Sequence, residues 1–313
     1  MASYLVTGVA GFVGAAVAAR LLGAGHEVTG VDNLTTGFRE NIPSGCVFLQ
    51  GNCQDETLYA RLPQRDYAAI YHIAGQSSGE ISFDDPVYDL QTNAQSTLLL
   101  LKFALNSKCR RFLYASTMSV YGDQPDAPVA EDAATNPKSF YGVGKLASEH
   151  YLRIYRQYGI ESACLRLFNI YGPGQNMENL RQGMVSIYLA QALKNRHIHV
   201  KGSGERYRDL VYIDDVVDAF LMLERAADGP ARIYNVGTSV RTTVGELIEK
   251  IRKLLPFEVS VKYDGSTPGD MFGITADCRK IARETGWQAR VGLNEGLQRM
   301  VTWAMPSASG QRQ

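Results

Sequence analysis

Tyr141 and Lys145 are four positions apart, a spacing that on a helix places both side chains on one face, one turn apart. Because tyrosine titrates near ~10 in model peptides, a tyrosine that accepts protons at pH 7 needs a pKa shift of ~3 units, worth about 4 kcal/mol. One positive charge ~5 Å away supplies roughly 3 kcal/mol at an effective dielectric of ~20. The pair therefore predicts a tyrosine base assisted by an ammonium group, although two surface residues can share this spacing by chance.

A glycine-rich segment near the start of the chain predicts a binding site for phosphate groups. Residues 4–7 predict a short buried strand, residues 12–22 predict a helix, and Gly8, Gly11 and Gly14 lie at the junction. Glycines let the backbone approach a pyrophosphate, and a helix N-terminus offers free N–H groups and the positive end of its dipole. A second strand over residues 27–31 follows, so the order of elements predicts a dinucleotide-binding βαβ unit.

Asp32 indicates which dinucleotide this unit takes. It follows Gly14 by 18 residues, about where an acidic side chain accepts hydrogen bonds from an adenosine ribose. A carboxylate at this point repels a 2′-phosphate, so we expect NAD in preference to NADP. An oxidised nicotinamide ring would also bring a second positive charge to Tyr141.

The remaining chain alternates strands and helices without internal repeats, which predicts an α/β protein with a Rossmann-type, doubly wound parallel sheet. Residues 111–115 predict a strand that delivers Thr117 at its carboxyl end, where ligands of open parallel sheets bind. Residues 87–105 and 139–158 each predict one long helix. The pattern changes after residue 171. We expect residues 1–171, with 209–239, to form the NAD-binding domain, and residues 172–208 and 240–313 to form a smaller, discontinuous C-terminal substrate lobe.

The order of motifs resembles that of the extended short-chain dehydrogenases/reductases, and within them the sugar-nucleotide epimerases. The resemblance extends from about Tyr4 to about Trp287. It rests on residues 7–14, 32–37, 51–52, 72–75, 93, 116–117, 120–122, 141–145, 166–169, 171–173 and 208–216. So many ordered matches are far more specific than any single motif.

The resemblance implies a role for most of the polar residues in these motifs. Tyr141, Lys145 and Thr117 would be catalytic, with Thr117 hydrogen-bonding the reacting sugar hydroxyl. The expected substrate contacts are Thr117, Asn169, Arg208 and Asp270. The expected NAD contacts are Gly8, Gly11, Phe12, Val13, Gly14, Asp32, Asn33, Asn52, Ala74, Gly75, Asn93, Tyr141 and Lys145. Simpler alternatives remain: Thr117 as a strand-end hydroxyl, Asn169 as a support for the turn at Gly172, and Arg208 as a solvated side chain.

Three departures from the family pattern bear on the substrate and the reaction. Asn52 stands where the family carries Asp, and Thr267 stands where it often carries an Arg for the diphosphate. Relatives that dehydrate hexoses carry Asp-Glu after the Thr, and relatives that decarboxylate sugar acids carry Glu before the Val-Tyr-Gly. Here Met118 and Ser119 occupy these positions, and neither can supply a proton for such reactions.

Composition excludes several other classes of function. Lys+Arg and Asp+Glu number 32 each in 313 residues, which does not favour a nucleic-acid or membrane-surface partner. The five scattered Cys indicate thiols in a reducing compartment, and no apolar run or signal-peptide pattern is present, so we expect a cytoplasmic protein. His72 is expected in the core, His197 and His199 lack further ligands for a metal, and Asp214-Asp215 is expected to cap the following helix.

These observations lead to an expected function. We expect epimerisation of a nucleoside-diphosphate hexose, at carbon 4, through transient oxidation to a ketone and return of the hydride. A nucleotide-sugar oxidoreductase, such as a ketose reductase, and a dinucleotide-sensing regulatory protein are the alternatives. The base and sugar substituents stay open. Apolar surface on the helices over 87–105 and 139–158, which in the family form a four-helix bundle between subunits, predicts a homodimer.

Overall fold

A seven-stranded parallel sheet forms the centre of the computed structural model, which describes residues 1–225 and 232–305. From one edge to the other the strands are β11 (Arg232–Val236), β6 (Glu161–Leu167), β5 (Arg111–Thr117), β4 (Tyr67–His72), β1 (Ser3–Thr7), β2 (Glu27–Asp32) and β3 (Val47–Gln50). The order reverses direction between β1 and β4, which is the doubly wound arrangement predicted from the sequence.

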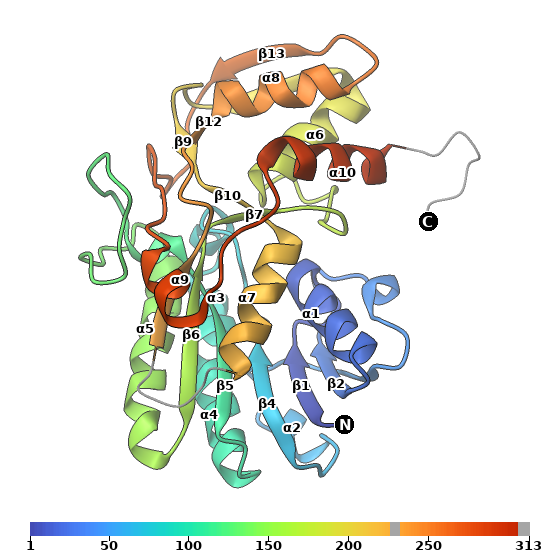
Figure 1. Ribbon diagram of the computed structural model, residues 1–313, viewed down its shortest axis with the longest axis vertical. Coiled ribbons are helices and arrows are strands. Elements are labelled where there is room, and N and C mark those ends of the chain that lie inside the picture. The colour runs from blue at the N-terminus through green and yellow to red at the C-terminus, as the bar shows by residue number, and fades with distance from the viewer. Residues whose placement is uncertain (226–231, 306–313) are drawn as a thin grey trace.

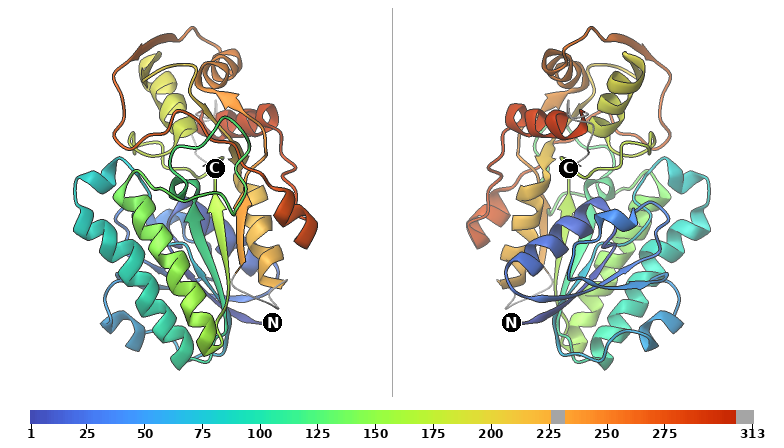
Figure 2. Two further views of the ribbon diagram at one scale, coloured as in Figure 1. Left: turned by 90° about the vertical axis from the view of Figure 1, so that its left-hand side faces the viewer. Right: turned by 90° about the vertical axis from the view of Figure 1, so that its right-hand side faces the viewer.

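Helices cover both faces of this sheet (Figure 2). Successive residues of a strand point to opposite faces, and apolar residues point to both of them, so each face needs a cover. Tyr4 and Val6 of β1 pack in a core with α1 (Phe12–Gly23) and α7 (Ile213–Arg225). Leu5 packs in a second core with α4 (Ser96–Asn106) and α5 (Phe140–Tyr155). Two short helices are α2 (Thr57–Ala60) and α3 (Pro86–Leu90). Single 3₁₀ turns lie at Arg39–Asn41, Ile81–Phe83, Met118–Val120 and Arg156–Tyr158.

The helix predicted over residues 87–105 is not a single α-helix. A π-helical turn, Gln91–Gln95, separates α3 from α4 and contains Asn93. Such turns widen a helix locally and are frequent at functional sites. Hydrophobic periodicity did not reveal this turn: Val87 and Leu90 of the predicted apolar stripe are exposed before it, whereas Leu101 is buried after it.

The smaller elements lie beyond the carboxyl ends of the sheet (Figure 1). Three two-stranded sheets form there: β7 (Asn169–Tyr171) with β10 (Leu210–Tyr212), β8 (His197–Lys201) with β13 (Ser260–Asp264), and β9 (Tyr207–Arg208) with β12 (Thr242–Thr243). The helices are α6 (Met184–Asn195), α8 (Val244–Leu254) and α10 (Leu293–Ala304), whereas α9 (Arg279–Thr285) packs beside β11. The division into two lobes stays a prediction, and residues 306–313 of the predicted second lobe lie outside the described residues.

Asp215 does not cap α7 as expected. Its carboxylate accepts hydrogen bonds of 3.0 Å from the backbone N–H groups of Arg290 and Val291, and so holds the segment before α10 against α7. Asp214 lies 3.6 Å from Arg299. In the part of the chain that the structure describes, no helix combines the length and apolar character that crossing a membrane requires.

Candidate active site

A cavity of about 480 Å³ opens at the carboxyl ends of the sheet strands and collects most of the predicted site residues. Those that line it are Gly8, Gly11, Phe12, Val13, Gly14, Asp32, Asn33, Ala74, Gly75, Thr117, Tyr141, Lys145 and Asn169. Asn52, Asn93, Arg208 and Asp270 do not line it. A second cavity, of about 610 Å³ beside α1 and α7, contains none of the predicted residues.

The glycine segment forms a cradle that no larger residue could occupy. Gly8 has φ +74°, and a Cβ added there would lie 2.8 Å from the backbone nitrogen of Ala74. A Cβ added to Gly14 would lie 2.0 Å from the carbonyl oxygen of Gly8. Gly11 precedes α1 and offers no side-chain cap, so the first N–H groups of that helix are left for an anion.

Asp32 closes this end of the cavity. Its carboxylate accepts hydrogen bonds from the backbone N–H groups of Ala10 at 3.0 Å and Leu34 at 2.8 Å. The two bonds hold the carboxylate at the rim of the glycine cradle, and each oxygen keeps a lone pair for a further donor. Asn33 lines the cavity and donates to the side chain of Asn52 at 2.9 Å, whereas Asn52 does not line it.

Local packing at the start of α5 positions Tyr141 and Lys145. The Ser139 hydroxyl caps the helix by accepting a hydrogen bond from the Gly142 N–H at 3.1 Å. Gly142 allows the helix to approach the strand end closely, since a Cβ there would lie 2.7 Å from the Ser119 carbonyl oxygen. The Lys145 ammonium donates to the Ala115 carbonyl at 2.9 Å, at the end of β5, two residues before Thr117.

Electrostatics in this cluster differ from the sequence-based expectation. Burial raises the pKa of Tyr141 to about 12, against a hydrogen bond with Thr117 that lowers it. Burial also lowers the pKa of Lys145 to about 8. Burial therefore sets the direction of the Tyr141 pKa in the protein alone, and a lowering of that pKa by Lys145 together with a bound cofactor stays a prediction. A further positive charge beside the phenol is needed before it can act as a base at neutral pH.

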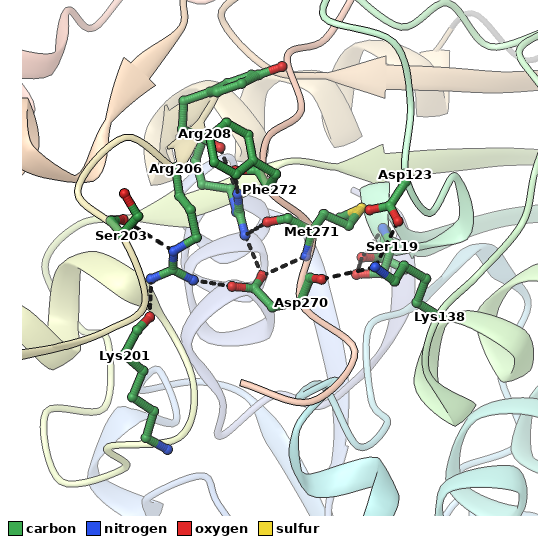
Figure 3. Close-up of polar contacts among 12 residues, drawn as sticks. Ser119, Asp123, Lys138, Lys201, Ser203, Arg206, Arg208, Asp270, Met271 and Phe272 are labelled. Atoms are coloured by element: carbon green, nitrogen blue, oxygen red, sulfur yellow. Dashed lines mark hydrogen bonds and ion pairs between the residues drawn. The ribbon is translucent and has the colours of Figure 1, made fainter. Parts of the chain in front are cut away.

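Arg208 and Asp270 bind each other outside the cavity lining (Figure 3). Arg208 is 2% exposed and also donates to the carbonyl groups of Tyr207 at 2.7 Å and Met271 at 2.8 Å. Arg206 pairs with the other oxygen of Asp270. Arg208 is therefore not a solvated side chain, and its contact with a substrate stays a prediction.

Asn169 and Asn93 each hold a buried side-chain carbonyl oxygen without a hydrogen-bond partner among the described residues. Asn169 lines the cavity at the start of β7, so a ligand can satisfy its amide. Asn93 donates to the carbonyl group of Gln76 at 3.0 Å, which fastens the π-helical turn to the loop after β4.

The expected core histidine is confirmed, since His72 is fully buried and hydrogen-bonded to Thr7 at 2.9 Å and Thr97 at 3.1 Å. His199 contacts the carboxylate of Asp264 through its Nε2 atom. Within residues 1–225 and 232–305, no three His, Cys, Asp or Glu side chains gather as a metal site would require.

Sequence reasoning missed the loops that face each other across the cavity. Gln182 donates to the Ser77 hydroxyl at 2.5 Å, and the Ser78 hydroxyl donates to the Arg181 carbonyl at 2.8 Å. Arg181 also pairs with Asp84 at 2.5 Å. These partners are about a hundred residues apart in the chain, so no spacing in the sequence could have linked them.

Comparisons with known proteins agree with this geometry. Residues 4–237 match the model of the NAD dependent epimerase/dehydratase family. The UDP-glucose 4-epimerase of Mycolicibacterium smegmatis is 35% identical over 304 residues, which cover 95% of this chain and 96% of that protein. UDP-glucuronic acid decarboxylase 1 of Arabidopsis thaliana is 32% identical over 308 residues, covering 95% of this chain and 68% of that protein.

A solved structure is similar over the same length. The crystal structure of UDP-glucose 4-epimerase with UDP-glucose from Thermotoga maritima superposes with a TM-score of 0.92 at 33% identity, covering 96% of this chain and 97% of that one. The glycine cradle, the uncapped start of α1 and the carboxylate of Asp32 fit the pyrophosphate and ribose of the family's cofactor, NAD. The chain belongs to the NAD dependent epimerase/dehydratase family.

Proposed function

We propose that this enzyme epimerises a nucleoside-diphosphate hexose at carbon 4, in the manner of UDP-glucose and UDP-galactose interconversion. One observation carries the proposal. Tyr141, Lys145 and Thr117 line a single cavity in which, among the described residues, Asp32 at the glycine cradle is the only lining carboxylate. The reacting end of the cavity therefore has a proton acceptor for a hydroxyl group and no carboxylic acid.

The side chains at positions 118 and 119 favour epimerisation over dehydration and decarboxylation. Loss of water from a hexose needs an acid and a base beside the sugar, and decarboxylation in the family uses a Glu before the Val-Tyr-Gly motif. In this chain Met118 is buried, and Ser119 lines the cavity and accepts a hydrogen bond from Thr117 at 3.2 Å. Neither side chain ionises near neutral pH, so neither can act as the general acid that those reactions need.

NAD, when bound, would accept a hydride from the sugar and return it. Gly8, Gly11 and Gly14 would hold its pyrophosphate and Asp32 its adenosine ribose. The phenol oxygen of Tyr141 would take the proton from the 4-hydroxyl group and give it back at the end of the cycle. The hydroxyl of Thr117 would orient that group, and the ammonium of Lys145 would stabilise the phenolate.

The identity of the nucleotide rests on the relatives. The Mycolicibacterium smegmatis and Thermotoga maritima proteins are named for UDP-glucose, and both are similar over nearly the whole chain. We therefore propose a uridine nucleotide, with Asn169 as one contact of the diphosphate region. The homodimer is likewise proposed, from the exposed apolar residues of α3 and α5.

A turnover experiment tests this function. The purified protein, without added cofactor, would be incubated with UDP-galactose, UDP-glucose and their N-acetylamino forms, and new anomeric signals would be followed by NMR. We expect interconversion of carbon-4 epimers without net consumption of NAD, and no product from Tyr141→Phe over the same period. Product formation that requires stoichiometric NADH would instead indicate a reductase. Binding of NAD without any turnover would indicate a sensor.

A further inference from the structure

Asp89 of α3 is a buried carboxylate that the proposed mechanism does not use. It is 0% exposed and lies outside the cavity lining. Its Oδ2 accepts hydrogen bonds from the side-chain amides of Gln76 at 2.8 Å and Asn93 at 3.3 Å. Its Oδ1 is buried and has no hydrogen-bond partner among the described residues. Burial raises the pKa of this carboxyl, and its two hydrogen bonds and the charge of Lys145 oppose that shift, so a positive charge nearby favours its ionised form.

The unpaired oxygen lies against the first turn of α5. A Cβ added to Gly144 would be 3.5 Å from Asp89 Oδ1 and 3.2 Å from Asn93 Cβ. Gly144 thus lets α3 and its π-helical turn pack closely on α5. This contact lies within the turn that separates Tyr141 from Lys145, so the carboxylate is close to the turn that carries both catalytic groups.

Lys145 is a buried ammonium group that lacks a negative charge among its direct contacts. Lys145 is 3% exposed and its ammonium has three donors, of which one hydrogen-bonds within the described residues, to the Ala115 carbonyl. The rings of Tyr114 and Tyr141 lie with their centres 4.9 and 5.9 Å from Nζ. These contacts orient the ammonium but supply no negative charge.

The other titratable groups that pack around Lys145 do not balance its charge. His72 on β4 is neutral, because burial and then the Lys145 charge lower its pKa to about 3. Burial raises the pKa of Tyr114 on β5 well above its ordinary value, so that phenol is neutral too. Glu149, one turn further along α5, forms an ion pair of 2.7 Å with Arg166. Asp89 is the remaining acid in this set.

We propose that Asp89 is a positioning residue for catalysis: it is the buried counter-ion that keeps Lys145 protonated beside Tyr141. Its role in turnover rests on the proposed function, but its effect on Lys145 belongs to the protein without substrate. The directions of the pKa shifts of Lys145 and Tyr141 agree with this role. Burial lowers the pKa of Lys145 and the charge of Asp89 opposes that shift, and the same charge raises the pKa of Tyr141.

Asp89→Asn tests the proposal because it removes the charge and keeps the shape. With protein labelled with ¹³C at the lysine ε carbon, a lysine that titrates near pH 8 stands apart from the others, and Lys145→Arg identifies its signal. We expect the titration midpoint of Lys145 to fall by roughly one pH unit in Asp89→Asn. Asp66→Asn, which removes an exposed carboxylate at the far end of β4, should leave the midpoint unchanged. An unchanged midpoint in Asp89→Asn would overturn the proposal.

Two further measurements separate this inference from folding and from the proposed function. If Asp89→Asn does not fold, the wild-type Lys145 signal decides: a second inflection in the acid range, where Asp89 takes up its proton, is expected, and its absence overturns the proposal. If the protein folds and turns over, both limbs of its pH–rate profile should move to lower pH in Asp89→Asn, because both pKa values fall. A fixed profile with a lower rate would mean a structural role only. The lysine titration needs no substrate, so it stands whether or not the enzyme is an epimerase.

Discussion

Arg166 on β6 donates two hydrogen bonds to the carboxylate of Glu149 on α5, from Nε at 3.0 Å and from its terminal nitrogen at 2.7 Å. The Ser116 hydroxyl adds a third at 2.5 Å. Both members of the pair are almost fully buried. The pair therefore joins the helix that carries Tyr141 and Lys145 to the strand ends that carry Thr117.

Removal of one partner of the Arg166–Glu149 pair should lower the free energy of unfolding. Glu149→Ala leaves an unpaired guanidinium in the core, and we expect a loss of about 3–5 kcal/mol in the free energy of unfolding, measured by urea denaturation. Glu295→Ala removes an exposed partner of Arg299 on α10 and should cost about 1 kcal/mol or less. Equal costs for the two variants would show that the buried pair does not hold α5 in place.

The proton acceptor can be tested by removing one oxygen atom. Tyr141→Phe keeps the buried ring, so NAD should still bind while turnover falls ~100- to 10,000-fold. Thr117→Ala should cost less, because it removes an orienting hydroxyl and leaves the base. Steady-state rates and a fluorescence titration with NAD measure both effects. Near-normal epimerisation by Tyr141→Phe would contradict the proposed mechanism.

Asp32 should determine the choice between NAD and NADP. The wild-type protein is expected to prefer NAD, and Asp32→Asn should bind NADP about tenfold more tightly than the wild type, because a 2′-phosphate no longer meets a carboxylate. Glu40→Gln, which neutralises an exposed carboxylate in the neighbouring 3₁₀ turn, serves as the control. Equal wild-type affinity for the two cofactors would remove this role from Asp32.

Exposed apolar side chains on α3 and α5 predict the homodimer. Val87 and Leu90 are 65% and 57% exposed, and Val143 and Ile154 are 52% and 48% exposed. We expect a dimer mass by sedimentation, and monomers from the double variant Val87→Asp, Val143→Asp, since two buried charges would oppose association. Val47→Asp changes an exposed apolar residue on β3 and should remain dimeric. A wild-type monomer mass at all concentrations would refute the prediction.

His72 should make the fold sensitive to acid. Its pKa in the folded protein, about 3, lies below the ordinary value of 6.5, so the unfolded chain binds the extra proton in this window. Stability due to neutral His72 is therefore present above pH 6.5 and is lost as the pH falls toward 3. Between pH 7 and pH 4 this loss is about 3 kcal/mol. Urea unfolding of wild-type protein and His72→Gln at both pH values should differ by that amount, and equal losses would contradict it.

Some predictions from the sequence succeeded because their causes are local. The glycine cradle follows from residues that must avoid a Cβ, and the strand–helix alternation follows from short buried apolar runs and from a hydrophobic period of 3.6 residues. Because the sheet is parallel, β5 places Thr117 at the carboxyl edge of the sheet, where Tyr141 at the start of α5 lines the same cavity. The π-helical turn at Gln91–Gln95 escaped prediction because an extra residue rotates the following helix by about 100°, and the sequence does not show which residues are then buried. Val87 and Leu90 before the turn are exposed, whereas Leu101 after it is buried.

By itself, therefore, the sequence determined the fold class and the glycine cradle, and it proposed the set of reacting side chains. The tertiary structure alone decided how these groups ionise and what they bind. Burial, which depends on every packed layer, raises the pKa of Tyr141 in the protein alone. Arg208 turns to Asp270, 62 residues later in the chain, and Asp89 lies against α5 through Gly144. Contacts between distant segments set local charge and solvation, and no spacing within one segment encodes them.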